Sequence, residues 1–358
     1  VLLVLSPSAA GSSQPLRPDK DTVSEFLSTH PLIIKTDTEI LDVTIQGEAL
    51  VIDLSQSILP NGMYDEGVFT QLQADLDLAL QINLFYMTTF KVEGEPLEFW
   101  GRPAPEIDTQ DELPSIEQLP VSGPLSGVKI ALSPGHGLYW NETYSDWRYQ
   151  RIEFFGVRED TINAEIMRYV KAALLSQGAT VIQLRELDFN ARIGVTGYPA
   201  WHESTRRYAI YEGLPSSVYD GSNNNYNSDI RARPYMANYY GADLFISLHN
   251  NGWNGDLRGT ETYYDINNHP NSGDFASAIH ESVINTIRED YDPDWIDRNV
   301  RATDWSYGEI YFAEMPAVLL ELAFMDNPID NSTLQDDAFK RLAARAITEG
   351  ICAYQGVA

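Results

Sequence analysis

The stretch Val128-Lys129-Ile130-Ala131-Leu132-Ser133-Pro134-Gly135-His136-Gly137 indicates the fold of the larger part of the chain. An apolar run ends there in Pro, Gly and a histidine, which is typical of a buried strand followed by a tight loop. Two further apolar runs, 244–248 and 318–320, also end directly on a polar side chain. Three predicted strands therefore lead into groups that bind metals or move protons, namely His136, His249 and Glu321.

The segments between these strands predict amphipathic helices. One helix begins at Glu159, carries its apolar residues on one face and ends at Gly178. Other helices are predicted over 233–240, 272–289 and 337–353, and other strands over 179–184 and 259–264. Strands that alternate with helices favour an α/β fold, with a mostly parallel, twisted sheet flanked by helices on both faces. Because ligands bind at the carboxyl ends of such strands, we expect the polar groups there to form one site.

The residue types at these strand ends suggest metal chemistry. Two imidazoles and one carboxylate are the protein ligands of a common type of catalytic zinc site, in which water completes the coordination. His136, His249 and the helix-opening Glu159 supply this set, and Glu321 supplies a second carboxylate that can serve as a base. Taken singly, His136 is also compatible with a plain loop residue and Glu159 with a helix cap. His202 is an alternative ligand.

From Val128 to about residue 355 the chain resembles the zinc-dependent N-acetylmuramoyl-L-alanine amidases, the type 3 amidases that hydrolyse bacterial cell walls. The similar segments occur in the family's order: 130–137 (IALSPGHG), 156–160 (GVRED), Arg233 with 237–238 (AN), 242–251 (ADLFISLHNN), 259–264 (GTETYY) and 316–328 (PAVLLELAFMDNP). The resemblance implies that His136, Glu159 and His249 hold Zn²⁺ and that Glu321 takes a proton from water and returns it to the leaving amine. The implied reaction cleaves the amide between the lactyl group of N-acetylmuramic acid and L-alanine in peptidoglycan.

The chain also departs from the family. Ser133 stands where the family often has Asp, which puts any supporting role of that carboxylate in doubt. Residues 138–155 and 187–230 look like insertions rich in aromatic side chains, and they either bind substrate, pack on their own domain or block the site. Candidate substrate contacts are Asn250, Asn251, Arg233 and Arg298. The plainer alternatives are turn formation for the asparagines and compensation of acidic charge for the arginines.

The remainder of the chain predicts three segments ahead of a catalytic domain over 128–358. Residues 1–20, apolar and then small, suggest the remnant of a signal peptide or a disordered arm. Residues 21–100 predict a small α+β domain of unknown role, with a hairpin around 43–54, faintly similar to a domain of sporulation and spore-germination proteins. Residues 101–127, rich in proline and acidic groups, predict a linker.

Composition restricts the partners of the protein. The chain has 24 Lys and Arg against 52 Asp and Glu, and its net charge of −28 argues against a nucleic-acid partner. Cys352 is the only cysteine, so disulfides within the chain and cysteine-based zinc clusters are excluded. No run reaches the ~20 apolar residues of a membrane-spanning helix. No heptad repeat indicates an oligomeric state.

The sequence thus predicts an exported zinc amidase of peptidoglycan that acts in the cell wall, in the periplasm or outside the cell. Two alternatives stay open: a catalytically silent amidase-fold protein that binds or supports the cell envelope, and a zinc amidase acting on another extracellular glycopeptide. Nothing in the sequence indicates the preferred stem peptide, or a role in division, sporulation, germination or lysis.

Overall fold

The computed structural model describes residues 17–46, 49–59, 66–80, 87–93, 95–96, 122–141, 144–220, 225–304 and 307–357. The chain forms two compact units, one built on residues up to Ile58 with Phe69–Pro96, the other on Leu59–Val68 with Leu97–Ala358. Most of the predicted N-terminal arm and the predicted linker up to residue 121 lie outside the described residues. No helix in the described ranges is long and apolar enough to cross a membrane. The predicted boundaries of the four segments stay predictions.

The smaller unit is an α+β structure. Its helices are α1 (Lys20–Thr29), α2 (Pro31–Thr36) and α3 (Glu66–Leu80), and its strands are β1 (Ile40–Gln46), β2 (Ala49–Leu54), β3 (Met87–Val92) and β4 (Glu95–Pro96). The strands form one sheet in the order β1-β2-β3-β4. The antiparallel pair β1–β2 is the hairpin predicted around residues 43–54, and Ile52 at its centre is fully buried.

The larger unit is built on a six-stranded sheet. Its strands are β5 (Lys129–Pro134), β10 (Thr180–Gln183), β11 (Leu244–Asn251), β12 (Thr260–Asp265), β13 (Asp297–Thr303) and β14 (Ala317–Phe324). Their order is β10-β5-β11-β14-β12-β13, and only the pair β12–β14 is antiparallel. The predicted α/β fold with a mostly parallel sheet is therefore confirmed.

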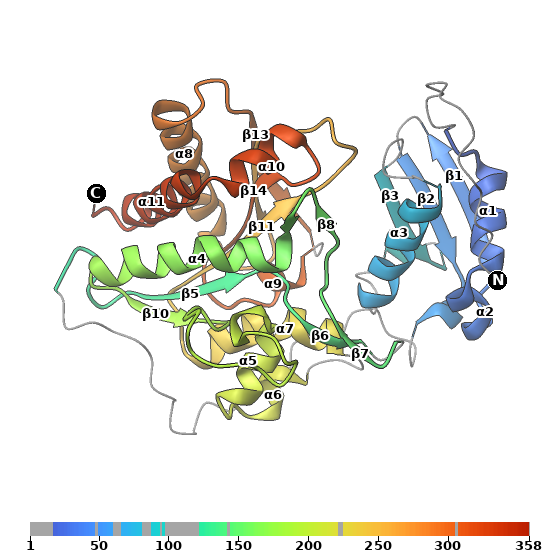
Figure 1. The fold of residues 1–358 in the computed structure, drawn as a ribbon, viewed down its shortest axis with the longest axis horizontal. Coiled ribbons are helices and arrows are strands. Elements are labelled where there is room, and N and C mark those ends of the chain that lie inside the picture. Colours follow the sequence, from blue (N-terminus) through green and yellow to red (C-terminus); the bar gives the residue numbers. More distant parts are fainter. Residues whose placement is uncertain are drawn as a thin grey trace. The chain divides into compact units, whose positions relative to one another are not determined.

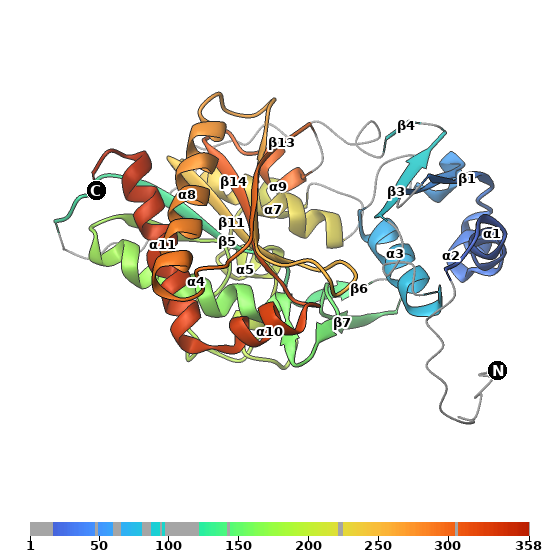
Figure 2. The ribbon, with the colours of Figure 1, turned by 90° about the horizontal axis from the view of Figure 1, so that it is seen from above.

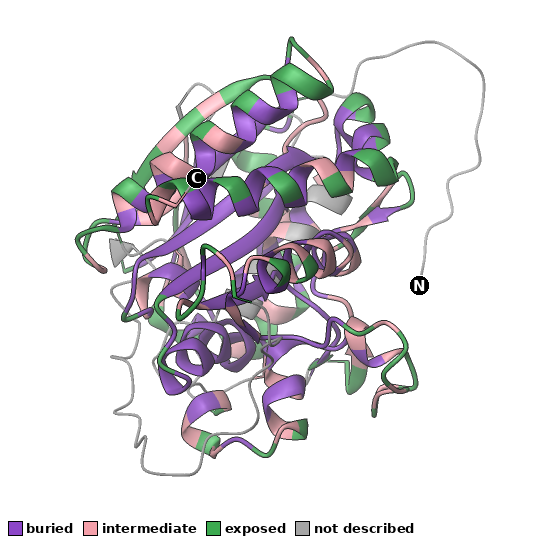
Figure 3. Cartoon of the chain, turned by 90° about the vertical axis from the view of Figure 1, so that its left-hand side faces the viewer, coloured by how far each residue is buried: buried purple, intermediate pink, exposed green. Residues whose placement is uncertain are grey.

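Two helical layers cover the sheet (Figures 1 and 2). Ile246 points to the layer of α4, α8 and α11, whereas the preceding Phe245 points to the layer of α5 and α7, as expected for successive residues of a strand. The central strands of the sheet, β5, β11 and β14, are buried almost throughout (Figure 3). The bounds of these helices are Glu159–Ser176 (α4), Thr205–Tyr211 (α5), Asn225–Tyr239 (α7), Ser272–Asp290 (α8) and Asp337–Tyr354 (α11).

The two segments that look like insertions contain short strands and helices. Residues 138–155 contain β6 (Tyr139–Asn141), β7 (Asp146–Arg148) and β8 (Glu153–Phe154), and β8 pairs with β9 (Val157–Arg158). The region 187–230 contains α5, α6 (Ser216–Tyr219) and the beginning of α7. Helix α7 starts eight residues before the predicted 233. The sequence did not reveal this earlier start, because the helix is buried on every side and therefore shows no amphipathic period.

Candidate metal centre

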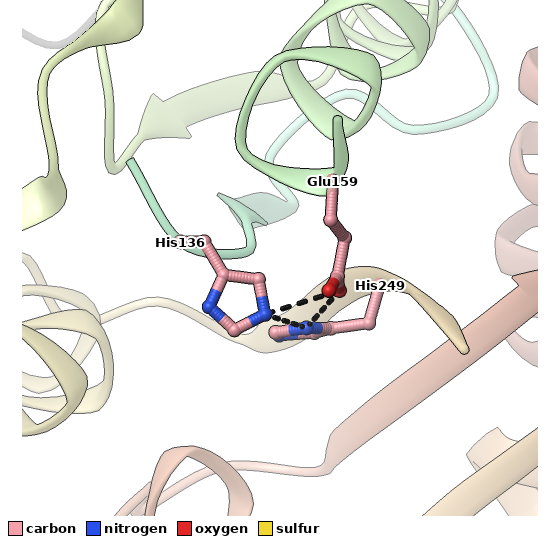
Figure 4. Close-up of side chains that lie close together, drawn as sticks. All are labelled: His136, Glu159 and His249. Carbon is pink, nitrogen blue, oxygen red and sulfur yellow. Dashed lines mark hydrogen bonds and ion pairs between the residues drawn. The ribbon is translucent and has the colours of Figure 1, made fainter. Parts of the chain in front are cut away.

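Three buried side chains converge at the carboxyl edge of the sheet (Figure 4). His136 follows β5, Glu159 is the first residue of α4, and His249 lies near the end of β11. Glu159 Oε1 lies 3.1 Å from His136 Nε2 and 2.8 Å from His249 Nδ1, and the two nitrogens are 3.1 Å apart. The three residues predicted as ligands are thus brought together, and none is more than 5% exposed.

The loop that carries His136 passes very close to the ring of His249. His136 itself has a φ of 64°, in the left-handed region that few side-chain-bearing residues occupy. A Cβ on Gly135 would lie 2.3 Å from the ring of His249, so only glycine allows the loop to pass this imidazole. The carboxylate of Asp160 accepts hydrogen bonds from the backbone of Gly137 and Gln150, which ties the loop to the start of α4.

Glu309, on the short helix α9 (Gly308–Tyr311), fixes the orientation of His249. His249 Nε2 lies 3.1 Å from Glu309 Oε1. An ionised carboxylate only accepts hydrogen bonds, so Nε2 carries a proton. Nδ1 is therefore the nitrogen left to face Glu159 and His136.

Gln150 does the same for His136. His136 Nδ1 lies 3.0 Å from Gln150 Oε1. The amide orientation follows from its other partners: its Nε2 donates to Asp229 over 2.7 Å, and its Oε1 accepts from Arg233 Nη2 over 3.2 Å. His136 Nδ1 therefore donates to this oxygen, and His136 Nε2 faces the cluster.

This arrangement fits a zinc ion. Four ligands around zinc at 2.0–2.1 Å are about 3.3–3.4 Å apart, and the spacings described above, 2.8 to 3.1 Å, are shorter by about 0.2–0.6 Å. Burial and the charge of Arg151 lower the pKa of His136 to about 3, so its Nε2 is free to bind. Burial disfavours the charge of Glu159, yet His136 and His249 hold its pKa well below the usual carboxyl range.

His249 is the exception in the metal-free protein. Burial lowers the pKa of His249, but Glu309 and Glu159 outweigh this effect and raise it to about 10. Nδ1 then holds a second proton directed at Glu159. A metal cation would take the place of that proton.

Glu321 lies beside this group on β14. It is paired with His249 in the parallel ladder between β11 and β14. Its Oε2 is buried and has no hydrogen-bond partner among the described residues. Burial, together with the charges of Glu159 and Glu261, raises the pKa of Glu321 to about 8 although His249 acts against it. A carboxylate with a free oxygen and a raised pKa can take up and release a proton near neutral pH.

The predicted substrate contacts occupy different places. Asn250 is buried, donates its backbone N–H to Glu159 Oε1 over 3.1 Å, and leaves its Oδ1 without a partner among the described residues. Asn251 Nδ2 and Arg298 Nε both bind Glu261, at 2.6 and 3.4 Å, and Glu261 is paired with Glu321 across β12 and β14. Of these three candidates, Asn250 therefore lies next to Glu159, and Asn251 and Arg298 lie beside Glu321 through Glu261.

Arg233 and His202 lie elsewhere. Arg233 is completely buried, and its guanidinium binds Glu309, Asp229 and Gln150. This burial argues against a substrate contact and makes Arg233 a support for the groups that hold the two imidazoles. His202 Nδ1 lies 2.6 Å from the hydroxyl of Tyr149 and is not part of the metal-binding group.

Sequence reasoning missed Gln150, Asp229 and Glu309. Gln150 and Asp229 fall in the two segments interpreted as insertions. Glu309 lies on a four-residue helix with no apolar period. No signal within these segments distinguishes the three residues from other polar side chains.

Comparison with known proteins places the region that carries this site in one family. The sequence profile of the N-acetylmuramoyl-L-alanine amidase family matches residues 130–353. This range is more than half of the chain and includes His136, Glu159, His249 and Glu321. The chain therefore belongs to this family, and the predicted family resemblance is confirmed.

Several curated relatives are similar over parts of the chain. The uncharacterized protein YqiI of Bacillus subtilis is 34% identical over 114 residues, which are 32% of this chain and 52% of that protein. An uncharacterized cell wall amidase of Bacillus anthracis is 30% identical over 151 residues, 39% of this chain and 26% of that protein. The germination-specific N-acetylmuramoyl-L-alanine amidase of Bacillus subtilis is 27% identical over 244 residues, 66% of this chain and 83% of that protein. The matches to the first two cover about half or less of those relatives' own length.

Proposed function

We propose that this protein is a zinc-dependent amidase that hydrolyses the bond between the lactyl group of N-acetylmuramic acid and L-alanine in peptidoglycan. The observation that carries the proposal is a buried cluster of two imidazoles and one carboxylate, with each imidazole oriented by a hydrogen bond and a second carboxylate, Glu321, beside them. Membership of the amidase family and the named activity of its relatives support the reaction type. The substrate belongs to the cell wall, so we also propose that the protein acts outside the cytoplasm.

His136, Glu159 and His249 would hold the metal. Zinc bound there would supply a Lewis acid that polarises the scissile carbonyl and makes water more acidic. The remaining chemistry falls to the side chains around it. Gln150 and Glu309 keep the two imidazoles oriented, and Arg233 holds both of these residues.

Glu321 would be the proton-transfer group. Its Oε2 would accept the proton of the attacking water and then pass it to the nitrogen of the leaving L-alanine. Its raised pKa suits both halves of this task, because the group must bind the proton and also give it up.

Substrate contacts would come from the edge of the site. Asn250 Oδ1, which is buried without a partner in the described part of the chain, is placed to accept an N–H of the stem peptide. Arg298 and Asn251 surround Glu261 beside the proposed base, and their donors are suited to carbonyl or carboxylate groups of the same peptide.

The test is amine release from purified peptidoglycan. We expect new L-alanine amino groups with the zinc-loaded protein, none after chelation, recovery when zinc is restored, and release at least about 100-fold slower with Glu321→Gln. Glu165→Gln is the matched control, because Glu165 lies on α4 and pairs with Lys340 over 2.6 Å. No release by folded, zinc-loaded protein would overturn the proposal in favour of a silent binding protein. Release from a different glycopeptide alone would correct the substrate.

A further inference from the structure

We propose that Glu309 is a positioning residue of the metal centre, which holds His249 by accepting a hydrogen bond from its Nε2–H group and so presents Nδ1 to the metal. This inference rests on the proposed zinc function. It concerns a residue that neither the sequence motifs nor the family resemblance singled out.

The carboxylate of Glu309 is fully engaged. Its Oε1 lies 3.1 Å from His249 Nε2 and also accepts from Arg233 Nη1, while its Oε2 accepts from the hydroxyl of Ser247. Ser247 and His249 are two residues apart on β11, so their side chains leave the strand on the same face. Glu309 therefore binds this stretch of β11 at two points and leaves His249 little freedom to rotate.

Balancing the charge of Arg233 does not require Glu309. Arg233 already pairs with Asp229, four residues earlier on α7, over 2.9 Å, and both side chains are fully buried. One carboxylate neutralises one guanidinium, so the second buried carboxylate brings a negative charge in excess. That excess faces His249, and it is there that a metal cation would compensate it.

The two imidazoles are supported through one residue. Arg233 donates a hydrogen bond to Glu309 from Nη1 and to Gln150 from Nη2. Glu309 in turn accepts a hydrogen bond from His249 Nε2, and Gln150 accepts one from His136 Nδ1. Gln150 is neutral and Glu309 is charged, so His249 receives the stronger hydrogen bond. A histidine ligand that donates to a carboxylate has a fixed tautomer and binds the metal more firmly.

The test compares substitutions that separate the position of the acceptor oxygen at residue 309 from the negative charge at that residue. Glu309→Gln keeps an acceptor at the same distance and removes the charge. Glu309→Asp keeps the charge for Arg233 and withdraws the acceptor by one methylene, and Glu309→Ala removes both. Glu203→Gln is the matched control. Glu203 is a buried carboxylate whose partners are Arg192 and the backbone of Thr196, and it is not part of the cluster of His136, Glu159 and His249.

Zinc affinity is measured on each folded variant by competition with a chelator, and the ¹⁵N spectrum of the His249 ring in the zinc-loaded protein reports its tautomer. We expect Glu309→Asp and Glu309→Ala to bind zinc about 10- to 100-fold more weakly than the wild type, with loss of the Nε2–H tautomer signal. We expect Glu309→Gln, which keeps the acceptor but loses the charge, to bind zinc more weakly than the wild type and more tightly than Glu309→Asp, and we expect Glu203→Gln to be unchanged. If Glu309→Ala does not fold, the Asp and Gln variants carry the comparison.

The reverse order, with Glu309→Asp near the wild type and Glu309→Gln weakened, would show that Glu309 serves only as a counter-charge and would overturn the proposal. Equal zinc affinity in all variants would overturn it as well, while leaving the zinc function intact. Failure of the wild-type protein to bind zinc would instead overturn the proposed function and this inference together.

Discussion

His249 and Glu321 are directly paired in the parallel ladder between β11 and β14. Adjacent strands lie about 4.8 Å apart, so the two side chains in this pairing share one edge and one face of the sheet. The two residues are 72 positions apart in the sequence, and the sheet alone brings them together. The relative placement of the proposed metal ligand and the proposed base is thereby fixed by backbone hydrogen bonds of the sheet.

Glu321→Gln separates catalysis from metal binding. We expect kcat to fall by about 100- to 10,000-fold, since proton transfer is lost. Zinc content should be unchanged, because Glu321 is not among the three converging ligands. The thermal midpoint should not fall, because the substitution replaces a carboxyl group whose charge is disfavoured by burial with a neutral amide of the same shape. Loss of zinc along with activity would show that Glu321 is a ligand rather than the base.

Gly135→Ala tests how closely the His136 loop passes His249. The new methyl group would lie 2.3 Å from the imidazole, so His249 must move and zinc affinity should fall at least about tenfold. Gly252→Ala is the control, since its added carbon would meet no atom closer than 3.8 Å. Equal zinc affinity in the two variants, measured by chelator competition, would contradict the close approach.

The sequence predicted the central strands of the sheet and the convergence of His136, Glu159 and His249, because each of these residues lies where an apolar run ends or a helix begins. The same reasoning placed Arg233 with the substrate, since nothing local shows that α7 is buried on every side. Strand β13 also escaped prediction, because its residues alternate between exposed and partly buried and include no apolar run. Gln150 and Glu309 act only through partners distant in sequence, and such contacts have no local pattern to detect.

Zinc binding should depend on pH in a defined direction. The pKa of His249 is raised to about 10 in the metal-free protein, so at neutral pH its Nδ1 is protonated and zinc must displace that proton. Each unit of pH increase between about 6 and 9 should therefore tighten the apparent affinity by about tenfold. Calorimetry in buffers of different ionisation enthalpy should show the release of about one proton. An affinity that is independent of pH would contradict the protonated state of His249.

The acidic surface should make the activity sensitive to salt. The chain carries a net charge of −28, and stem peptides with free carboxylates are themselves anionic, so encounter with the substrate is opposed by repulsion. Added salt shortens the Debye length from about 10 Å at 0.1 M to about 3 Å at 1 M, which weakens that repulsion. We expect KM to fall and kcat to stay constant as NaCl increases, because screening acts on approach and not on the buried donors. A peptidoglycan whose stem carboxylates are amidated should show a smaller effect. A KM that stays level or rises with salt would mean that the surface charge does not govern approach, and that the arginines near Glu261 attract the substrate locally.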